Sequence, residues 1–273
     1  MLGKSADERH YVLLAEKIKK AFHENTVCCN KEHLYGNGTQ SGYGCVLYSG
    51  IVPDGKREEA VERLVRSIEE ADYHLTSGEV GLKQVFSALA ENGRSDIVYR
   101  MVTNKTMPGY QYFVEKGLTT LPEYWNFEDL WNGLGRSRNH AMMGHVKEWF
   151  TRYLAGIQPD GTAYDTVVIR PAVIEQLDEV YGSVDTVHGN IISHWKCDRK
   201  KNSFIMEITL PVGVTASVYV PVVNEKQTVK CNGRPVPVSN AGGEYMRLRD
   251  MLESGFYNLE IQTDPKTEKA TEF

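Results

Sequence analysis

The spacing of apolar residues changes near Gly156, and this change constrains the fold more than any other feature of the chain. Before Gly156 the apolar side chains recur every three or four residues, which is the period of an amphipathic helix. After Gly156 they recur at every second residue, which is the period of a strand with one buried face. The single switch predicts a helical domain followed by a domain built of β-strands.

Four apolar stripes at helical spacing define the first part. Gly93 follows the third stripe and Gly156 follows the fourth, as expected where a helix ends in a residue of positive φ. The short connection at 93–95 leads into a further helix, so consecutive helices are expected to form antiparallel hairpins. The stripes are Tyr11, Leu14, Ile18 and Phe22; Val61, Leu64, Val65 and Ile68; Leu82, Val85, Phe86 and Leu89; and Met142, Val146, Trp149, Phe150, Tyr153 and Leu154.

The second part contains several short runs of alternating apolar residues separated by turn dipeptides, which is typical of an antiparallel β-sandwich. Asn232-Gly233 predicts a hairpin turn, and Ser254-Gly255 introduces a last strand. The predicted organisation is a helical domain at 1–156, a β-sandwich domain at 157–264 and a polar tail at 265–273.

Composition excludes several classes of function. The 31 basic and 36 acidic residues give a formal charge of −5, which does not indicate a nucleic-acid or anionic-membrane partner. The sequence contains no run of eighteen apolar residues, so no transmembrane helix is predicted. The first residues lack the apolar region of a secretory signal. The five cysteines show no metal-ligand spacing, so we expect free thiols, no metal site and no cofactor. The compartment is not indicated.

The stretch from Gly117 to Ile157 carries the residues best suited to chemistry. Glu123 lies directly before two aromatic residues, and Asn139 and His140 stand where the fourth amphipathic helix is expected to begin. Aromatic rings can cover the apolar faces of a pyranose, and a carboxylate can act as a general base. This combination favours a site that binds a sugar and activates water. The alternative for Glu123 is a surface carboxylate near a helix start, and the alternative for each aromatic residue is the core.

The pattern GxTTxxExW, followed one loop later by an Asn-His pair at a helix start, resembles the α-L-rhamnosidases of glycoside hydrolase family 78. Further segments match that family in order: the HLTSGEVG run at 74–81, the helix pair at 89–101, the turn at 108–112 and the strand opening at 187–191. The resemblance covers roughly residues 35–261, and the ordered combination is more specific than any one motif.

The resemblance implies an (α/α)6 toroid of six helical hairpins, with the site in the funnel where the hairpin loops meet, followed by a β-sandwich. About seven helices are predicted here, which is roughly half of such a toroid. The chain is therefore expected to be either a C-terminal piece of a longer protein or an incomplete barrel.

The resemblance also implies roles for individual residues. Glu123 corresponds to the general base that activates water in an inverting mechanism. The substrate-binding positions are His140, Asn139, His74, Trp125 and Tyr110, the last of which is usually tryptophan in the family.

The family's general acid lies in a DxPxRDE-type motif that this sequence lacks, and the charge cluster at 7–9 is expected to be a solvated helix start. We therefore expect the isolated chain to be inactive. Should it nevertheless hydrolyse a rhamnoside, Glu128 and Asp129 are the first carboxyls to examine.

Three functions remain open from the sequence. The first is the C-terminal part of an inverting α-L-rhamnosidase that hydrolyses terminal α-L-rhamnosyl residues. The second is a non-catalytic sugar-binding or scaffolding fragment that acts with a partner, either the missing N-terminal half or another copy of the chain. The third is a six-hairpin glycosidase of different sugar specificity. The upstream reading frame distinguishes the first two.

Overall fold

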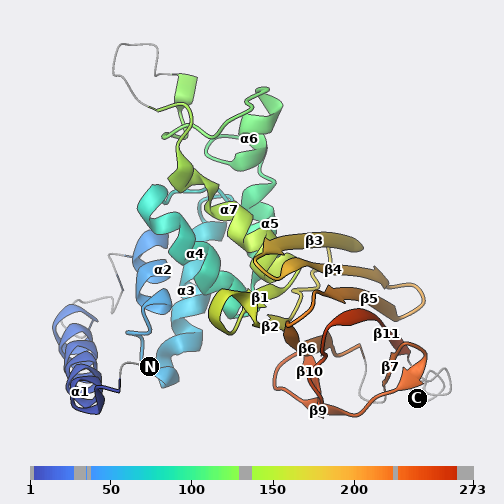
Figure 1. Cartoon of the computed structure of the whole chain (residues 1–273). Helices are drawn as coiled ribbons and strands as arrows, with labels where there is room; N and C mark the ends of the chain where they lie inside the picture. The colour runs from blue at the N-terminus through green and yellow to red at the C-terminus, as the bar shows by residue number, and fades with distance from the viewer. Residues whose placement is uncertain (1–2, 28–34, 36–37, 129–136, 224–226, 263–273) are drawn as a thin grey trace, which may run out of the picture. The chain divides into compact units, whose positions relative to one another are not determined.

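The computed structural model describes residues 3–27, 35, 38–128, 137–223 and 227–262. The chain forms two compact units, Met1–Val146 and Lys147–Phe273 (Figure 1). The first unit is helical and the second consists mainly of strands, as the change in apolar spacing predicts.

The helical unit is a series of short helices joined by tight connections. The second and third apolar stripes lie buried along α3 and α4, as predicted. Gly93 follows α4 with a φ of +75°, which confirms the predicted helix end. The α-helices are α1 (Ser5–Phe22), α2 (Gln40–Tyr48), α3 (Arg57–Glu69), α4 (Glu79–Glu91), α5 (Ser95–Val102) and α6 (Tyr110–Glu115), with a π-helical turn η1 (His23–Val27) and a 3-10 turn η3 (Asp54–Lys56) between them.

Helix α1 forms where the first stripe predicts it, but the stripe is not buried in the described structure. No residue of α1 is buried, and Tyr11 is 66% exposed. Leu14 and Ile18 on the same stripe are also exposed. A stripe at helical spacing therefore identified the helix without indicating what covers it.

Helices α2 and α4 cross at very short range. A Cβ atom at Gly44 would lie 2.9 Å from the backbone N and Cα of Val85, and a Cβ atom at Gly81 would lie 2.4 Å from Ser41 Oγ. Ser41 Oγ also donates a hydrogen bond to Ser77 Oγ over 2.9 Å. The close crossing fixes the position of the α4 N-terminus, where the candidate site begins.

The segment at 141–154 is not the single amphipathic helix that the fourth stripe predicts. It consists of a 3-10 helix η5 (Ala141–His145), one α-helical turn α7 (Val146–Glu148) and a π-helix η6 (Trp149–Leu154). These helix types differ in residues per turn, so the stripe does not stay on one face. Met142 and Phe150 are exposed as a result.

The end of this segment belongs to the strand-rich unit because its backbone bonds to that unit. Leu154 O accepts a hydrogen bond of 2.8 Å from the indole Nε1 of Trp195, and Tyr153 O accepts one of 2.8 Å from Ala172 N.

The strand-rich unit is a sandwich of two sheets (Figure 1). The five-stranded sheet has the order β1 (Ile157–Pro159), β2 (Thr166–Ile169), β6 (Thr215–Pro221), β10 (Tyr245–Leu248), β9 (Val238–Asn240). The six-stranded sheet has the order β3 (Glu179–Thr186), β4 (Gly189–Asp198), β5 (Ser203–Leu210), β11 (Gly255–Gln262), β7 (Thr228–Cys231), β8 (Arg234–Pro235). A short 3-10 turn, η7 (Thr162–Tyr164), lies between β1 and β2.

The pairing of the strands is antiparallel, as predicted, except between β2 and β6, which run parallel with Thr166 opposite Thr215. Strand β5 alternates as its sequence predicts, with Phe204 buried and Ile205 exposed. Asn232 and Gly233 both have positive φ between β7 and β8, which confirms the predicted hairpin turn.

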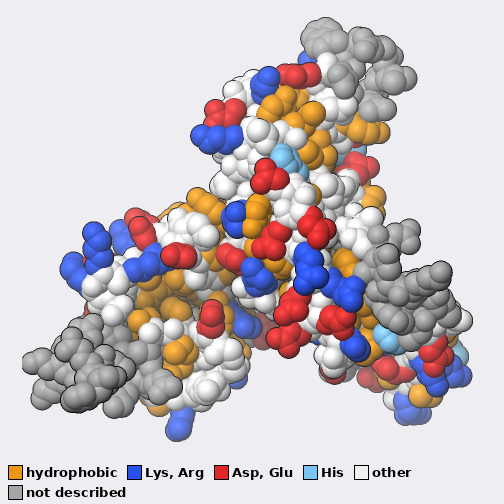
Figure 2. Space-filling model, turned by 180° about the vertical axis from the view of Figure 1, so that it is seen from behind, with side chains coloured by type: hydrophobic (Ala, Val, Ile, Leu, Met, Phe, Trp, Pro, Cys, Tyr) orange, Lys and Arg blue, Asp and Glu red, His pale blue; other side chains and the backbone are white. Residues whose placement is uncertain are grey.

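The surface carries both signs of charge. Figure 2 shows acidic and basic side chains interspersed over the coloured part of one face. Several of them form exposed pairs, such as Glu59 with Lys56 and Arg63, which contribute little to stability. None of the described helices is both long and apolar enough for a membrane span.

Candidate functional site

Three segments of the helical unit come together around Glu123. Glu123 N donates a hydrogen bond of 3.0 Å to Ser137 O, and His140 N donates one of 2.7 Å to Leu121 O. These bonds place the segments at 121–125 and 137–140 side by side. Trp125 Nε1 donates a bond of 3.2 Å to Ser77 O, which brings in the start of α4 as the third segment. The structure therefore brings together residues that lie far apart in the sequence.

The Glu123 carboxylate is half-buried and held on one side. Its Oε2 accepts a hydrogen bond of 2.9 Å from Ser137 N. Its Oε1 makes no hydrogen bond to any residue that the structure describes. A carboxylate with one oxygen fixed by the backbone and the other free has the geometry that a general base needs.

Trp125 is supported by two other aromatic rings. It stacks on Phe113 with ring centres 5.4 Å apart and an interplanar angle of 16°, and it meets the edge of Tyr110 at 5.3 Å and 88°. With its indole nitrogen bonded to Ser77 O, the ring is fixed in place while part of its surface stays accessible. These contacts make it a preformed platform.

Tyr110 lies behind this platform. Its side chain is 6% exposed, and its hydroxyl donates a hydrogen bond of 2.6 Å to Met143 O. Burial raises the pKa of the Tyr110 hydroxyl, which keeps it a neutral donor. A ring in this position supports Trp125 and has little surface to offer a sugar.

Two further predicted site residues have local roles. The ring of His74 lies within hydrogen-bond distance of Ala71 O and Thr106 Oγ1, each at 2.8 Å, so both of its nitrogens hold the loop before α4. Asn139 is exposed, and its backbone N donates a bond of 3.2 Å to Ser137 Oγ. The amide of Asn139 makes no hydrogen bond to a described residue and is free to meet a ligand.

His140 has a carboxylate neighbour that the sequence patterns did not single out. Its Nε2 lies 2.5 Å from Oε2 of Glu79, the first residue of α4. Both atoms are shielded from solvent, and neither makes a hydrogen bond to a described residue. At 2.5 Å no water fits between the two atoms, so the side chains are in direct contact. Glu79 lies inside the HLTSGEVG run, but its pairing could not be read from the run.

Glu128, one of the two carboxyls named as a possible alternative acid, is engaged elsewhere. Its Oε1 lies 2.9 Å from Lys116 Nζ, and the hydrogen bond from Lys116 lowers the pKa of Glu128. A carboxyl with a lowered pKa is a poor proton donor at neutral pH. Asp129 lies outside the described residues.

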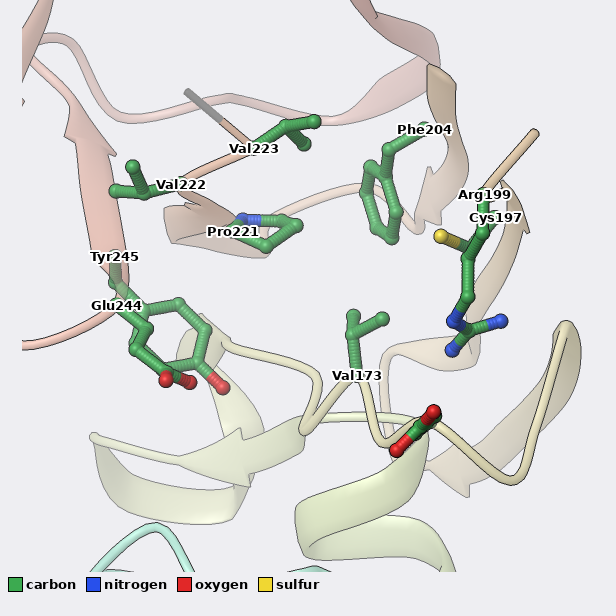
Figure 3. A pocket seen from close by; sticks show the side chains of 10 residues that line it. Val173, Cys197, Arg199, Phe204, Pro221, Val222, Val223, Glu244 and Tyr245 are labelled. Atoms are coloured by element: carbon green, nitrogen blue, oxygen red, sulfur yellow. The ribbon is translucent and has the colours of Figure 1, made fainter. Parts of the chain in front are cut away.

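A hollow lies in the strand-rich unit, between the ends of the two sheets (Figure 3). It encloses about 310 Å³. Glu244 and Tyr245 lie on one side and Arg199 and Cys197 on the other, while Phe204 lies between them. Burial raises the pKa of the Cys197 thiol. None of the site residues predicted from the sequence lines this hollow. The lining residues are Val173, Glu175, Cys197, Arg199, Phe204, Pro221, Val222, Val223, Glu244 and Tyr245.

Comparison with known families assigns both parts of the chain. Residues 1–154 match the bacterial α-L-rhamnosidase six-hairpin glycosidase domain, and residues 156–234 match the bacterial α-L-rhamnosidase C-terminal domain. The chain belongs to the bacterial α-L-rhamnosidase family. This agrees with the family that the sequence motifs indicate.

Individual relatives support the assignment. An α-L-rhamnosidase of Streptomyces avermitilis is 30% identical over 253 residues, which are 91% of this chain and 23% of that protein. The structure of an α-L-rhamnosidase from Dictyoglumus thermophilum matches 96% of this chain and 29% of its own, with 30% identity and a TM-score of 0.85. The structure of the Streptomyces avermitilis α-L-rhamnosidase in complex with L-rhamnose matches 93% of this chain and 24% of its own, with 28% identity and a TM-score of 0.80.

The chain is short beside these proteins. It spans 23% to 28% of the length of three curated relatives that it matches and 17% of the length of a fourth.

Proposed function

We propose that this chain supplies the general-base side of an inverting α-L-rhamnosidase site that hydrolyses terminal α-L-rhamnosyl residues. The observation that carries the proposal is the Glu123 carboxylate, which Ser137 N holds by Oε2 while Oε1 stays free of described partners. The family assignment supports the rhamnoside as substrate class, since a matching relative is described as complexed with L-rhamnose.

Each residue around Glu123 has a part in this proposal. Trp125 stacks on one face of the sugar ring, as a rigid indole with an accessible surface can do. His140 and Asn139 form hydrogen bonds with the hydroxyls of the sugar. Glu123 Oε1 takes a proton from the water that attacks the anomeric carbon, opposite the leaving group. Tyr110 supports the platform from behind, since its ring is buried.

The proton donor to the leaving oxygen is the part that this sequence does not supply in the family's motif. Inversion needs a second carboxyl about 6.5–9.5 Å from the base, leaving room for the water. Glu128 is tied to Lys116, and Glu79 is turned toward His140. We propose that the donor comes from residues beyond these 273, contributed by a longer form of the protein or by a partner chain.

The decisive test is Glu123→Gln, with Glu128→Gln as the matched control from the same loop. Turnover of an aryl α-L-rhamnoside is measured in this chain and in the longest product of its reading frame. We expect Glu123→Gln to lower turnover about 10²-fold or more, because a carboxamide cannot accept the water's proton. Glu128→Gln should leave it nearly unchanged. If the parent is active and the turnover of Glu123→Gln stays within about threefold of the parent's, Glu123 is not the general base.

A second candidate function is sugar binding without hydrolysis by the chain as it stands. The observation that favours it is the complete anchoring of Trp125, Glu123 and His140 within this chain, together with the missing acid motif. Affinity for L-rhamnose is then expected to be roughly millimolar, near −4 kcal/mol, because an open site orders its ligand poorly. Binding with no turnover supports this candidate, and turnover above the uncatalysed rate excludes it.

A further inference from the structure

The side chain of Gln40, the first residue of α2, is buried against the loop that precedes α4. It is 2% exposed, and both of its polar atoms bond to the backbone of that loop. Nε2 donates a hydrogen bond of 3.0 Å to His74 O, and Oε1 accepts one of 3.2 Å from Thr76 N. A carboxamide supplies a donor and an acceptor side by side, as these two backbone groups require. Gln40 therefore ties the loop to α2.

The same loop carries the carbonyl that anchors the sugar platform. Ser77 follows the stretch held by Gln40 and is 1% exposed. Its O accepts the hydrogen bond of 3.2 Å from the indole Nε1 of Trp125. Its Oγ accepts one of 2.9 Å from Ser41 Oγ, on the residue next to Gln40. The first two residues of α2 thus hold the loop directly beside the anchor of Trp125.

Other bonds hold the earlier part of this loop. The ring of His74 lies within hydrogen-bond distance of Ala71 O and Thr106 Oγ1, and Leu75 N donates a bond of 3.1 Å to Pro108 O. Thr76 N is also within 3.1 Å of His74 O, which is a bond inside the loop. Within the described residues, the bonds that tie Thr76 N and Ser77 Oγ to another element come from α2.

The hydrogen bond to Ser77 O fixes a rotation of Trp125 that ring contacts leave open. Stacking on Phe113, at an interplanar angle of 16°, sets the plane of the indole. Stacking has little directional preference within that plane, so it does not determine where the indole N–H points. The Ser77 carbonyl does, and its own position depends on the loop that Gln40 and Ser41 hold.

We propose that Gln40, together with Ser41, is a positioning residue that sets the Ser77 carbonyl and thereby the orientation of the Trp125 ring on which the sugar stacks. The inference rests on the proposed function, in which Trp125 is the platform. It adds to that function two residues that touch no sugar and act only through the loop between α2 and Trp125.

The first measurement follows the indole N–H of Trp125 in the ligand-free chain. In ¹⁵N-labelled protein, comparison with Trp125→Phe identifies its signal, and the indole of Trp195, which donates to Leu154 O in the strand-rich unit, is the internal reference. Gln40→Met keeps the length of the side chain but has neither polar atom. We expect it to speed the exchange of the Trp125 N–H with deuterium about three- to tenfold, because the bond to Ser77 O is weakened. An unchanged exchange rate overturns the inference.

The second measurement asks whether Gln40 affects sugar binding through Trp125. L-rhamnose affinity is measured by NMR titration in the parent, Gln40→Met, Trp125→Phe and the double variant. We expect Gln40→Met to weaken binding about three- to tenfold in the parent background. In the Trp125→Phe background the same change should weaken it less than about twofold, because a phenyl ring has no N–H for Ser77 O. Equal factors in the two backgrounds indicate a merely structural role and overturn the inference.

Val46→Ala is the matched control for stability, since Val46 is a buried residue of the same helix. Its truncation should lower the unfolding free energy and leave the exchange of the Trp125 N–H within about twofold of the parent's. If Val46→Ala speeds this exchange as much as Gln40→Met, lost stability explains both and the inference falls. If Gln40→Met does not fold, Ser41→Ala decides: it removes only the bond to Ser77 Oγ and should speed the same exchange, and no change overturns the inference.

Failure of the proposed function has a different signature. A parent chain that does not bind L-rhamnose removes the proposed function and the sugar as the ligand of the platform. The exchange of the Trp125 N–H is measured without ligand, so it still decides whether Gln40 positions the ring.

Discussion

Gly44→Ala tests whether the close crossing of α2 and α4 positions the site. The added Cβ would lie 2.7 Å from Val85 Cγ2 and 2.9 Å from the backbone N and Cα of Val85. Backbone atoms cannot move aside by a rotamer change, so the helices must separate by about 0.5–1 Å to restore ordinary carbon contacts. Such overpacking costs about 3 kcal/mol, and the better helix propensity of alanine returns about 1 kcal/mol. We expect a net loss of about 2 kcal/mol from the free energy of unfolding.

The assay is urea unfolding of the whole chain, followed by the helical circular dichroism signal. The matched control is Gly55→Ala, where an added Cβ would meet no atom within 4 Å, and a change within about 0.5 kcal/mol is expected. Because the chain has two compact units, the transition of the strand-rich unit should stay where it is. If the proposed function holds, L-rhamnose affinity should also fall, since Ser77, just before α4, accepts the hydrogen bond from the Trp125 indole. An unchanged unfolding midpoint for Gly44→Ala would refute the crossing.

Two further predictions concern the strand-rich unit. Trp195→Phe removes the donor to Leu154 O inside the core, and we expect a loss of about 1–3 kcal/mol in urea unfolding of this unit; an unchanged midpoint would contradict it. Hydrogen bonds from His194 and then Lys196 lower the pKa of Glu179. Its ionised form therefore stabilises the folded unit above the usual carboxyl range, and this contribution is lost as the pH falls through the lowered pKa. Glu179→Gln should therefore reduce the loss of unfolding free energy as the pH is lowered. If the dependence on pH keeps its slope in this variant, the interactions of Glu179 with His194 and Lys196 are not its cause.

The features that the sequence predicted correctly are those in which local spacing and burial agree. The stripes on α3 and α4 are buried because each helix has a neighbour on its apolar side within the described residues. Strand β5 alternates because one of its faces meets the other sheet. The turn at Asn232-Gly233 depends on φ preferences that belong to two residues alone.

The features that the sequence did not reveal depend on contacts between distant segments. The change from 3-10 to α to π geometry at 141–154 keeps Met143 buried while Met142 is exposed, which no single period can describe. The parallel pairing of β2 with β6 requires knowledge of which strands meet, and alternation says nothing of direction. Tyr110 was expected to contact the sugar, yet its side chain is buried and its hydroxyl donates a hydrogen bond to Met143 O.

In the candidate site, too, the sequence predicted the individual residues but not the contacts between them. Motifs pointed to Glu123, Trp125 and His140 separately, whereas the bonds that unite them are long-range: Trp125 to Ser77 and Glu123 to Ser137. Both bonds join residues of one unit within the described part of the chain. In the proposed mechanism, by contrast, the proton donor to the leaving group comes from outside this set of residues. If the proposed function holds, binding and hydrolysis are separable properties: we expect this chain to bind a rhamnoside against Trp125, and we expect hydrolysis only when a proton donor is supplied as well.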